Sequence, residues 1–293
     1  MSATKDRPFS RVGRILARSL RVLGAFYAGL VMGPAPRTTS VQVLVDRVIN
    51  LNAVVGYFIP SLTYVLSQKI VDSDHVVFRP FTDDFEKVSD TYEPIVRKLL
   101  SPQHSEVIID VGGNIGVHTI WLSRKVGPQG IILAVEPEPS NFAVLKLNLG
   151  INNLCNVIPI RLALGANPGR GQLVIPSPSV MGQATTITSN HLSKRVLVSA
   201  DFETLDGVTS AFGLSQVAAI KIDVEGAEVD VIRGAVRTIS KFRPRLVIEA
   251  HGHSNLNSLK LLLESMHMTI ASQTRASSRP NETRWFVLAI YSP

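Results

Sequence analysis

The sequence predicts an α/β fold: a doubly wound, mostly parallel sheet that ends in an antiparallel C-terminal strand and follows a helical N-terminal extension. Two patterns support this expectation. Short runs rich in Val, Ile and Leu have the length and continuity of strands buried on both faces, and they lie at Val107 to Val111, Ile131 to Val135, Val157 to Leu162, Ala218 to Ile222 and Arg245 to Glu249. Stretches that read as helices alternate with these runs at Ile115 to Lys125, Ser140 to Leu149 and Glu225 to Ser240.

The segments outside this alternation predict the remaining architecture. Gly171 to Ser199 is rich in Pro, Ser, Thr and β-branched residues and predicts a hairpin or loop inserted over the sheet. Trp285 to Tyr291 predicts a terminal strand, antiparallel at or near an edge. Val41 to Ile70 is apolar and reads as helical, with Pro60 interrupting it. We therefore divide the chain into a basic, apolar helical extension, residues 1–75, and an α/β domain, residues 76–293.

Positive charge is concentrated at the N-terminus. The net charge is +7, and residues 1–40 hold seven Lys or Arg residues against a single acid, Asp6. On a helix, Arg11, Arg14, Arg18 and Arg21 share one stripe opposite Leu and Val side chains. That pattern is typical of an interfacial helix, but a surface helix docked on the domain and a short secretory signal fit it too. We expect a cytoplasmic protein, with peripheral contact of this arm at the inner face of a membrane as an open alternative.

Composition excludes several classes of protein. The chain is 45% apolar and 18% charged, which excludes global disorder. The apolar stretches Val22 to Pro36 and Leu51 to Gln68 are too short or too interrupted for a polytopic membrane protein. Cys155 is the single cysteine, which excludes an internal disulfide and multi-cysteine metal sites. Beyond the basic arm the chain is almost neutral, so the charge gives little support to a nucleic-acid-binding body.

The first strand-to-helix turn carries an acid and glycines in the sequence DVGGNIG. It lacks the G-x-G-x-x-G pattern of dinucleotide sites, because Asn114 stands two residues after Gly112, and it lacks the Gly-Lys-Ser/Thr of a phosphate loop. Asp110 would repel a pyrophosphate at the helix N-terminus. It would attract a ligand that carries an ammonium and a sulfonium group. S-adenosyl-L-methionine carries both, so we expect it as the cofactor.

The second strand supports this choice of cofactor. It ends in Glu136, where a carboxylate can accept hydrogen bonds from both ribose hydroxyls. Turn geometry and close helix packing alone would also explain Gly112, Gly113 and Gly116. That explanation is compatible with cofactor binding.

Six segments keep a regular order and spacing from about Val76 to the C-terminus: VIIDVGGNIGVHTIWLS, AVEPEPSNFAVLKLNLGINN, RLALG, ETLDGV, AIKIDVEGAEVDVIRGA and RPRLVIEAH. They resemble the FkbM family of S-adenosylmethionine-dependent methyltransferases, and IKIDVEGAE is the most specific of them. The segment VVFRPFTDDFEKV matches more loosely, and residues 1 to about 75 have no counterpart. The resemblance implies a class I methyltransferase (Rossmann-like) fold and methyl transfer, in this family typically to an oxygen.

The resemblance also implies which residues bind the cofactor. Asp110, Gly112 and Asn114 would hold the methionine end, Glu136 the ribose, and Asn141 would lie near the adenine edge. Gly113 stands where relatives often have Ala, a change between small residues. The cofactor-binding residues expected on this basis are Asp110, Gly112, Gly113, Asn114, Gly116, Glu136 and Asn141.

The chemistry of transfer directs attention to the ends of the fourth and fifth strands. Methyl transfer from a sulfonium is an in-line displacement, so the protein must align acceptor and methyl group, and a hydroxyl acceptor must lose its proton. Asp223, Glu225 and His251 lie at the same sheet edge as Asp110 and Glu136. One of the three would be the base, or two would hold a divalent cation that acidifies the hydroxyl. Alternatively, Asp223 caps the following helix and Glu225 opposes its dipole.

Three further side chains near this edge have weaker claims. Glu249 and His253 flank His251 and are secondary candidates for catalysis. His118 stands where many relatives carry an aromatic residue, and we interpret it as a packed helix residue and not as a catalyst. Metal dependence and oligomeric state stay open.

Rival functions are judged on the same residues. An amino methyltransferase acting on bases would show an Asn/Asp-Pro-Pro-aromatic turn, which the segment DVEG lacks, and a cytosine C5 enzyme needs a nucleophilic Cys, whereas Cys155 lies in a loop. Nucleic acid is therefore not expected as a partner, and a nicotinamide oxidoreductase is disfavoured by the glycine pattern. We expect O-methylation of a hydroxyl on a small-molecule, sugar or lipid-linked glycan acceptor. The alternative is a membrane-tethered S-adenosylmethionine-binding protein without catalysis.

Overall fold

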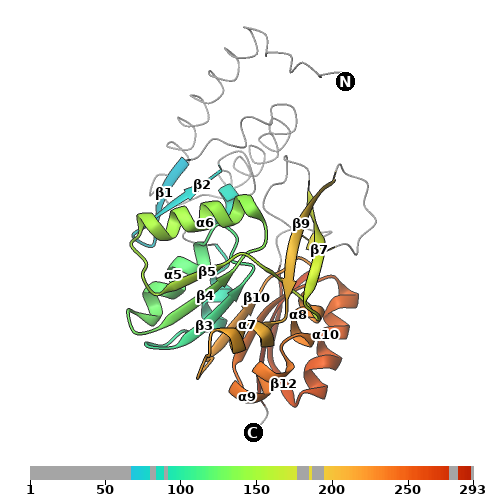
Figure 1. The fold of residues 1–293 in the computed structure, drawn as a ribbon. Coiled ribbons are helices and arrows are strands. Elements are labelled where there is room, and N and C mark those ends of the chain that lie inside the picture. Colours follow the sequence, from blue (N-terminus) through green and yellow to red (C-terminus); the bar gives the residue numbers. More distant parts are fainter. Residues whose placement is uncertain are drawn as a thin grey trace, which may run out of the picture.

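The structure, a computed structural model, describes residues 67–79, 84–88, 92–176, 185–186, 195–276 and 283–291. Its centre is a seven-stranded sheet with strand order β12-β13-β11-β10-β3-β4-β5 (Figure 1). The strands are β3 (Val107–Val111), β4 (Ile131–Val135), β5 (Val157–Ile160), β10 (Ala219–Ile222), β11 (Arg245–His251), β12 (Met268–Arg275) and β13 (Arg284–Tyr291).

Strand β13 runs against the rest of this sheet. It pairs antiparallel with both β11 and β12, whereas the neighbours from β11 to β5 pair in parallel. This order and direction are those of the class I methyltransferase fold, and the predicted antiparallel C-terminal strand near an edge is confirmed. The chain leaves β3 toward β4 on one side and returns to β10 on the other, so the topological switch point lies between β3 and β10.

Helices cover both faces of the sheet. The helices α4 (Pro94–Leu100), α5 (Val117–Val126) and α6 (Pro139–Ile151) form one apolar cluster with the sheet. On the other face lie α7 (Leu205–Ala211), α8 (Glu228–Arg233), α9 (Val236–Phe242) and α10 (His253–Ser265). Successive strand residues alternate between the layers, as when Ile108 joins the first cluster and Ile109 the second. Strands buried on both faces are therefore confirmed.

The predicted helix from Glu225 to Ser240 is wrong as a single element. Glu225 lies in the turn before α8, and the helical stretch is divided between α8 and α9 at Gly234 and Ala235. At Gly234 a Cβ atom would lie 2.1 Å from the carbonyl oxygen of Gly165, so the backbone passes too close to the neighbouring segment for any side chain. Packing against that segment changes the direction of the chain where local propensity favours one helix.

The predicted insertion is a hairpin in a second, smaller sheet. The strands β6 (Ala163–Leu164), β7 (Gly169–Pro176), β8 (Thr185–Thr186) and β9 (Arg195–Glu203) have the order β6-β9-β7-β8. β7 and β9 pair antiparallel over their whole length and project beside the main sheet (Figure 1). A hairpin between Gly171 and Ser199 is thus confirmed, and its strands extend beyond the predicted segment at both ends.

A second hairpin, of β1 (Ser67–Val71) and β2 (Asp74–Phe78), packs against α6. The fully buried side chain of Asn148 accepts from the amide of Val77 and donates to the carbonyl oxygens of Val77 and Ile115. The prediction of helix up to Ile70 is therefore wrong from Ser67 onward, because strand pairing and these contacts override the apolar pattern. The predicted boundary at 75 falls inside this hairpin, and the division of the chain stays a prediction.

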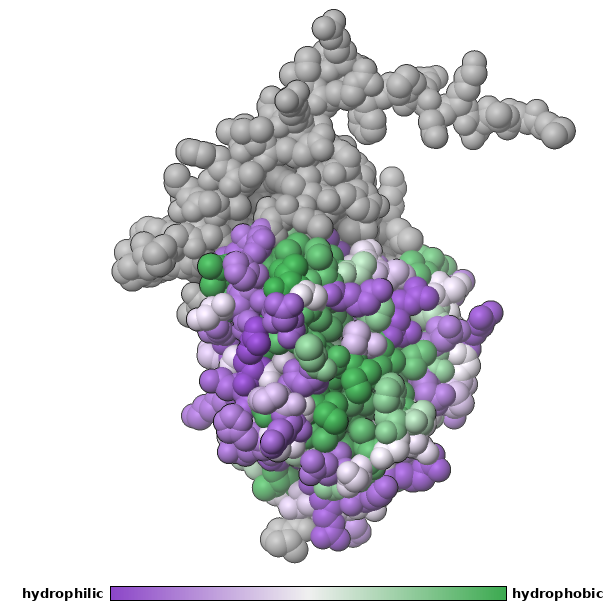
Figure 2. Space-filling view, turned by 60° about the vertical axis from the view of Figure 1, so that its left-hand side comes forward, coloured by the Kyte–Doolittle hydropathy of each residue, from purple (hydrophilic) through white to green (hydrophobic). Residues whose placement is uncertain are grey.

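The remaining predictions for the N-terminus fall on residues 1–66, which lie outside the described residues. They include the arginine stripe and the interruption at Pro60. Within the described ranges no helix is both long and apolar enough to cross a bilayer. The short helix α3 (Asp84–Lys87) follows the β1–β2 hairpin. On the face of the molecule shown in Figure 2, a band of hydrophobic side chains is bordered by hydrophilic ones.

Candidate active site

The turn after β3 is built on contacts that only glycine permits. The amides of Gly112 and Gly113 donate to the carbonyl oxygen of Val135 at 2.9 and 3.0 Å. Gly112 has a φ of 80°, and a Cβ atom there would lie 1.8 Å from the carbonyl oxygen of Asp223. At Gly116, with a φ of 96°, it would lie 2.7 Å from a methyl group of Leu145. Both positions therefore require glycine.

Asp110 is fully buried at the end of β3, next to a buried lysine. One oxygen, Oδ2, accepts from the hydroxyl of Thr119 at 2.6 Å, and the other, Oδ1, lies 3.3 Å from Nζ of Lys221 and accepts no hydrogen bond from the described residues. Lys221 Nζ also lies 3.7 Å from Asp223. Burial alone would lower the pKa of Lys221, but the charges of Asp110 and Asp223 raise it above its usual value. The lysine is therefore a permanent cation between two carboxylates.

Glu136 is held by backbone amides at the end of β4. Its oxygens accept from the amides of Asn114 at 2.8 Å and Glu138 at 3.0 Å, and from the side-chain amide of Asn141 at 3.4 Å. Burial raises its pKa to about 7, although these hydrogen bonds oppose the rise. Asn141 in turn accepts from Arg79 at 2.6 Å. Asp110, Glu136 and the glycine turn therefore lie together at this edge of the sheet, and their role in binding the cofactor stays a prediction.

Asp223 and Glu225 occupy the turn after β10. Glu225 has a φ of 52° and Gly226 a φ of 108°, two successive left-handed residues that end the strand sharply. The N-cap of α8 is Ala227, without a side-chain cap. Asp223 therefore does not cap the helix as the alternative interpretation proposed. Burial pushes the pKa of Asp223 upward, but Lys221 and His251 hold it below its usual value.

His251 joins these acids from the end of β11. Its Nδ1 lies 2.8 Å from Oε1 of Glu228, and its Nε2 lies 3.2 Å from Oε2 of Glu225 and 3.6 Å from Oε1 of Glu249. Burial would lower the pKa of His251, but the hydrogen bond that it donates to Glu228 and the nearby carboxylates raise it to about 10. Burial also raises the pKa of Glu225, to about 7, against the charge of His251. At neutral pH the imidazole is therefore a cation among acids.

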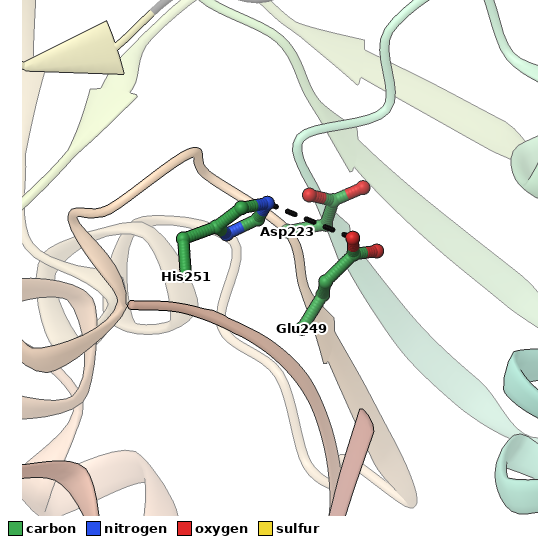
Figure 3. A group of neighbouring side chains, drawn as sticks. All are labelled: Asp223, Glu249 and His251. Carbon is green, nitrogen blue, oxygen red and sulfur yellow. Dashed lines mark ion pairs between the residues drawn. The ribbon is translucent and has the colours of Figure 1, made fainter. Parts of the chain in front are cut away.

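Asp223, Glu249 and His251 point toward one another (Figure 3). Each offers one atom to a group whose members all lie within 4.8 Å of one another, and two carboxylates with an imidazole can bind a divalent cation. Two of the three already have cationic partners, because Lys221 pairs with Asp223 and Arg284 with Glu249. The arrangement thus brings together the three predicted catalytic residues and the secondary candidate Glu249.

The other two histidines considered from the sequence contact other partners. His253 packs edge-on against Trp285, with ring centroids 4.5 Å apart. His118 is 6% exposed on α5, with its Nε2 2.9 Å from Oε2 of Glu93 and its ring beside that of Tyr92. The interpretation of His118 as a packed residue is confirmed.

Sequence reasoning missed several residues of the site. Lys221 sits inside an apolar strand, and a lysine in a strand buried on both faces was a signal that it pairs with a carboxylate. Glu228 looks like an ordinary first-turn acid, yet it is fully buried. Arg284 reaches Glu249, and Arg79 reaches Asn141, from segments distant in sequence, and no local pattern indicates these two contacts.

Comparison with known proteins identifies the family. The family model described as the methyltransferase FkbM domain matches residues 110–269. The chain belongs to this family. It is an S-adenosylmethionine-dependent methyltransferase, which confirms the cofactor expected from the sequence.

Several named methyltransferases match this chain over most of their own length. Methyltransferase 1 of Beauveria bassiana is 29% identical over 200 residues, covering 62% of this chain and 79% of that protein. The hexuronic acid methyltransferase AglP of Haloferax volcanii is 27% identical over 59% of this chain and 68% of its own length. The 2-O-methyltransferase NoeI of Sinorhizobium fredii is 26% identical over 56% of this chain and 72% of its own. A solved FkbM methyltransferase from Methylobacillus flagellatus has a TM-score of 0.45 at 21% identity, over 62% of this chain and 43% of that one.

Proposed function

We propose that this methyltransferase methylates a hydroxyl group of a sugar or similar small polyhydroxylated acceptor, free or lipid-linked, with Glu225 as the proton-accepting base. The observation that carries the proposal is the pair formed by Glu225 and His251, 3.2 Å apart at the sheet edge beside the turn of Gly112. The names of two relatives, a hexuronic acid methyltransferase and a 2-O-methyltransferase, support the acceptor class and the transfer to oxygen.

The residues around the first turn fit S-adenosylmethionine. Asp110 and Asp223 oppose the single charge of Lys221, which leaves one negative charge for a cationic ligand, and Asp110 Oδ1 accepts no hydrogen bond from the described residues. Glu136 is a buried carboxylate whose hydrogen bonds with the described residues all come from amide donors, which suits it to accept hydroxyl donors of a ribose. We assign the cofactor to Asp110, Gly112, Gly113, Asn114, Gly116, Glu136 and Asn141.

The proton of the acceptor hydroxyl passes to Oε2 of Glu225. S-adenosylmethionine supplies a methyl group bound to a sulfonium and leaves as S-adenosylhomocysteine. A pKa of about 7 makes Glu225 a stronger base than an exposed glutamate, while about half of it is ionised at neutral pH. His251, cationic beside it, favours this ionised form. Asp223 keeps Lys221 at the junction of the two turns.

Two alternatives to this function differ from it: a metal-assisted transfer and a binding protein without catalysis. A divalent cation held by Asp223, Glu249 and His251 would acidify the hydroxyl in place of a carboxylate base. Chelation would then abolish turnover, whereas it leaves turnover unchanged if Glu225 is the base. A membrane-tethered binding protein without catalysis finds no support among the relatives, which are named as methyltransferases.

The test measures formation of S-adenosylhomocysteine by the full chain with hexoses, uronic acids and phenols as acceptors. We expect turnover with a sugar and at least a tenfold loss in Glu225→Gln, with cofactor affinity within about twofold of wild type. Glu264→Gln, an exposed carboxylate on α10, is the matched control and keeps full turnover. Wild-type turnover in Glu225→Gln would refute its role as base, and a preference for phenols over every sugar would refute the acceptor class.

A further inference from the structure

Glu228 connects three segments of the site through one buried carboxylate. Its Oε1 accepts from the amide of Gly226 at 2.9 Å and lies 2.8 Å from Nδ1 of His251, and its Oε2 accepts from the side-chain amide of Asn255. The residue is 0% exposed. A buried carboxylate is tolerated only where such partners replace water. The three partners lie in the turn after β10, at the end of β11 and on α10.

The contact with His251 determines what the imidazole presents to the site. Because a carboxylate only accepts, Nδ1 must carry a proton to bind Oε1, and Nε2 is left to face Glu225 at 3.2 Å. The adjacent negative charge also favours a second proton on the ring. Glu228 therefore fixes both the orientation and the charge of His251, and His251 is the cation that pairs with Glu225.

The contact with Gly226 determines where Glu225 stands. Glu225 is a non-glycine residue at a φ of 52°, a conformation that costs about 1 kcal/mol and persists only where surrounding contacts impose it. The amide of the next residue, Gly226, is bound to Glu228. One carboxylate thus contacts both His251 and the turn that carries Glu225.

We propose that Glu228 is a positioning residue of this active site, which holds His251 with Nε2 toward Glu225 and holds the turn that carries Glu225. The inference rests on the proposed role of Glu225 as the base. Glu228 does not touch the acceptor, because its two oxygens are occupied by Gly226, His251 and Asn255. Glu228 therefore affects the reaction only by positioning Glu225 and His251.

The direction of the effect follows from the charges around Glu225. Asp223 raises its pKa, and the cations His251, Lys87 and Arg284 lower it. His251 in turn faces Glu228, Asp223 and Glu249. Removing the charge of Glu228 makes His251 lose its second proton more easily, so Glu225 loses its cationic partner. The base is then ionised only at higher pH, and the acidic limb of the turnover profile moves upward.

The test compares Glu228→Gln with wild type in full pH profiles of kcat and KM. We expect kcat at pH 7 to fall at least tenfold, the acidic limb to rise by about one pH unit, and the Kd for S-adenosylmethionine and the acceptor KM to stay within about twofold. Glu228→Asp, which keeps the charge, should return the acidic limb toward its wild-type position. Asp230→Asn, an exposed acid on the same helix, is the matched control with an unchanged profile.

The outcomes distinguish a positioning role of Glu228 from a role in the stability of the fold alone. A profile of Glu228→Gln that superimposes on wild type, or a fall in kcat that parallels a loss of thermal stability without a shifted limb, would overturn the inference. Should Glu228→Gln fail to fold, Asn255→Ala removes a partner of Oε2 and leaves both contacts of Oε1. Asn255→Ala should leave the acidic limb of kcat unchanged. A limb shifted as far as in His251→Gln would refute the assignment of the positioning effect to Oε1 of Glu228. Loss of turnover in Glu225→Gln with an unshifted Glu228→Gln profile would refute the role of Glu228 alone.

Discussion

Glu136, at one half of the sheet edge, and the Glu225–His251 pair, at the other half, are held by different kinds of contact. At the ends of β3 and β4, Glu136 is bound largely by backbone amides, and the glycine turn is fixed by close approach of the main chain. At the ends of β10 and β11, Asp223, Glu225 and His251 are bound by side-chain ion pairs. Contacts made by the main chain do not depend on the type of side chain and allow little variation. Side-chain pairs depend on several elements, so single substitutions can change their charge.

The largest effect is expected where the backbone contact of the first half is broken. Gly112→Ala places a Cβ atom on the carbonyl oxygen of Asp223 and strains a φ of 80°. We expect loss of cofactor binding and at least about 3 kcal/mol less free energy of unfolding. Gly213→Ala, at a φ of 59° with open space around it, is the control for strain alone and should cost about 1 kcal/mol. Equal urea denaturation midpoints for the two variants would show that the contact is not the constraint.

Removing the amide-bound carboxylate of the same half should affect binding and not the base. Glu136→Ala takes away the acceptor expected for the ribose and leaves two amides without their partner. Cofactor affinity should fall by about 1 to 3 kcal/mol, the usual cost of removing a charged hydrogen-bond partner. Titration calorimetry measures it, with the acidic limb of kcat as the internal control. If the acidic limb of kcat shifted while cofactor affinity stayed unchanged, Glu136 would act on the base and not on the cofactor, and the roles assigned to the two halves would be reversed.

The pKa of Glu136 gives this half its own pH dependence. In the cofactor-free chain burial raises this pKa to about 7, so the carboxyl is protonated below that pH and its ionised form is what accepts hydroxyl donors. Cofactor affinity should therefore rise about tenfold between pH 6 and pH 8. By the same linkage, Glu136 makes the folded chain less stable as pH rises from about 4.5 to 7, because the unfolded carboxyl ionises first. Calorimetry on Glu136→Gln should give a flatter affinity profile, and an equally steep one would assign the change to another group.

The smallest effect expected is the coupling between the halves. Glu136 and Glu228 share no contact and lie at the ends of different elements. The double variant Glu136→Ala, Glu228→Gln should lose the sum of the two single losses in kcat/KM, to within about 0.5 kcal/mol. The single variants supply the controls. A coupling above about 1 kcal/mol would show that the halves act as one network.

The difference between the halves also explains what the sequence could predict. Asp110, Gly112 and Glu136 lie within one strand–turn–helix–strand segment, so their residue types and spacing indicated both fold and cofactor. Glu228 and Lys221 reach their partners only through packing of strands and helices, and the sequence shows them as a helix acid and a strand residue. The wrong predictions have the same origin. The helix expected through Ile70 and the single helix from Glu225 follow local patterns that tertiary contacts override.

Because Gly112 has no side chain, backbone contact sets the distance between the turn after β3 and the turn after β10. The backbone of the first turn lies directly against the carbonyl of Asp223, so the spacing between the two turns is that of two main chains in contact. Moving the two turns apart would leave a void between them, and moving them closer would make their main chains overlap. Under the proposed function, with the cofactor at the turn after β3 and the base at the turn after β10, this contact would fix the distance between the methyl donor and the acceptor. A change of acceptor must therefore come from substitutions of the side chains around these two turns, because the distance between the turns themselves is fixed.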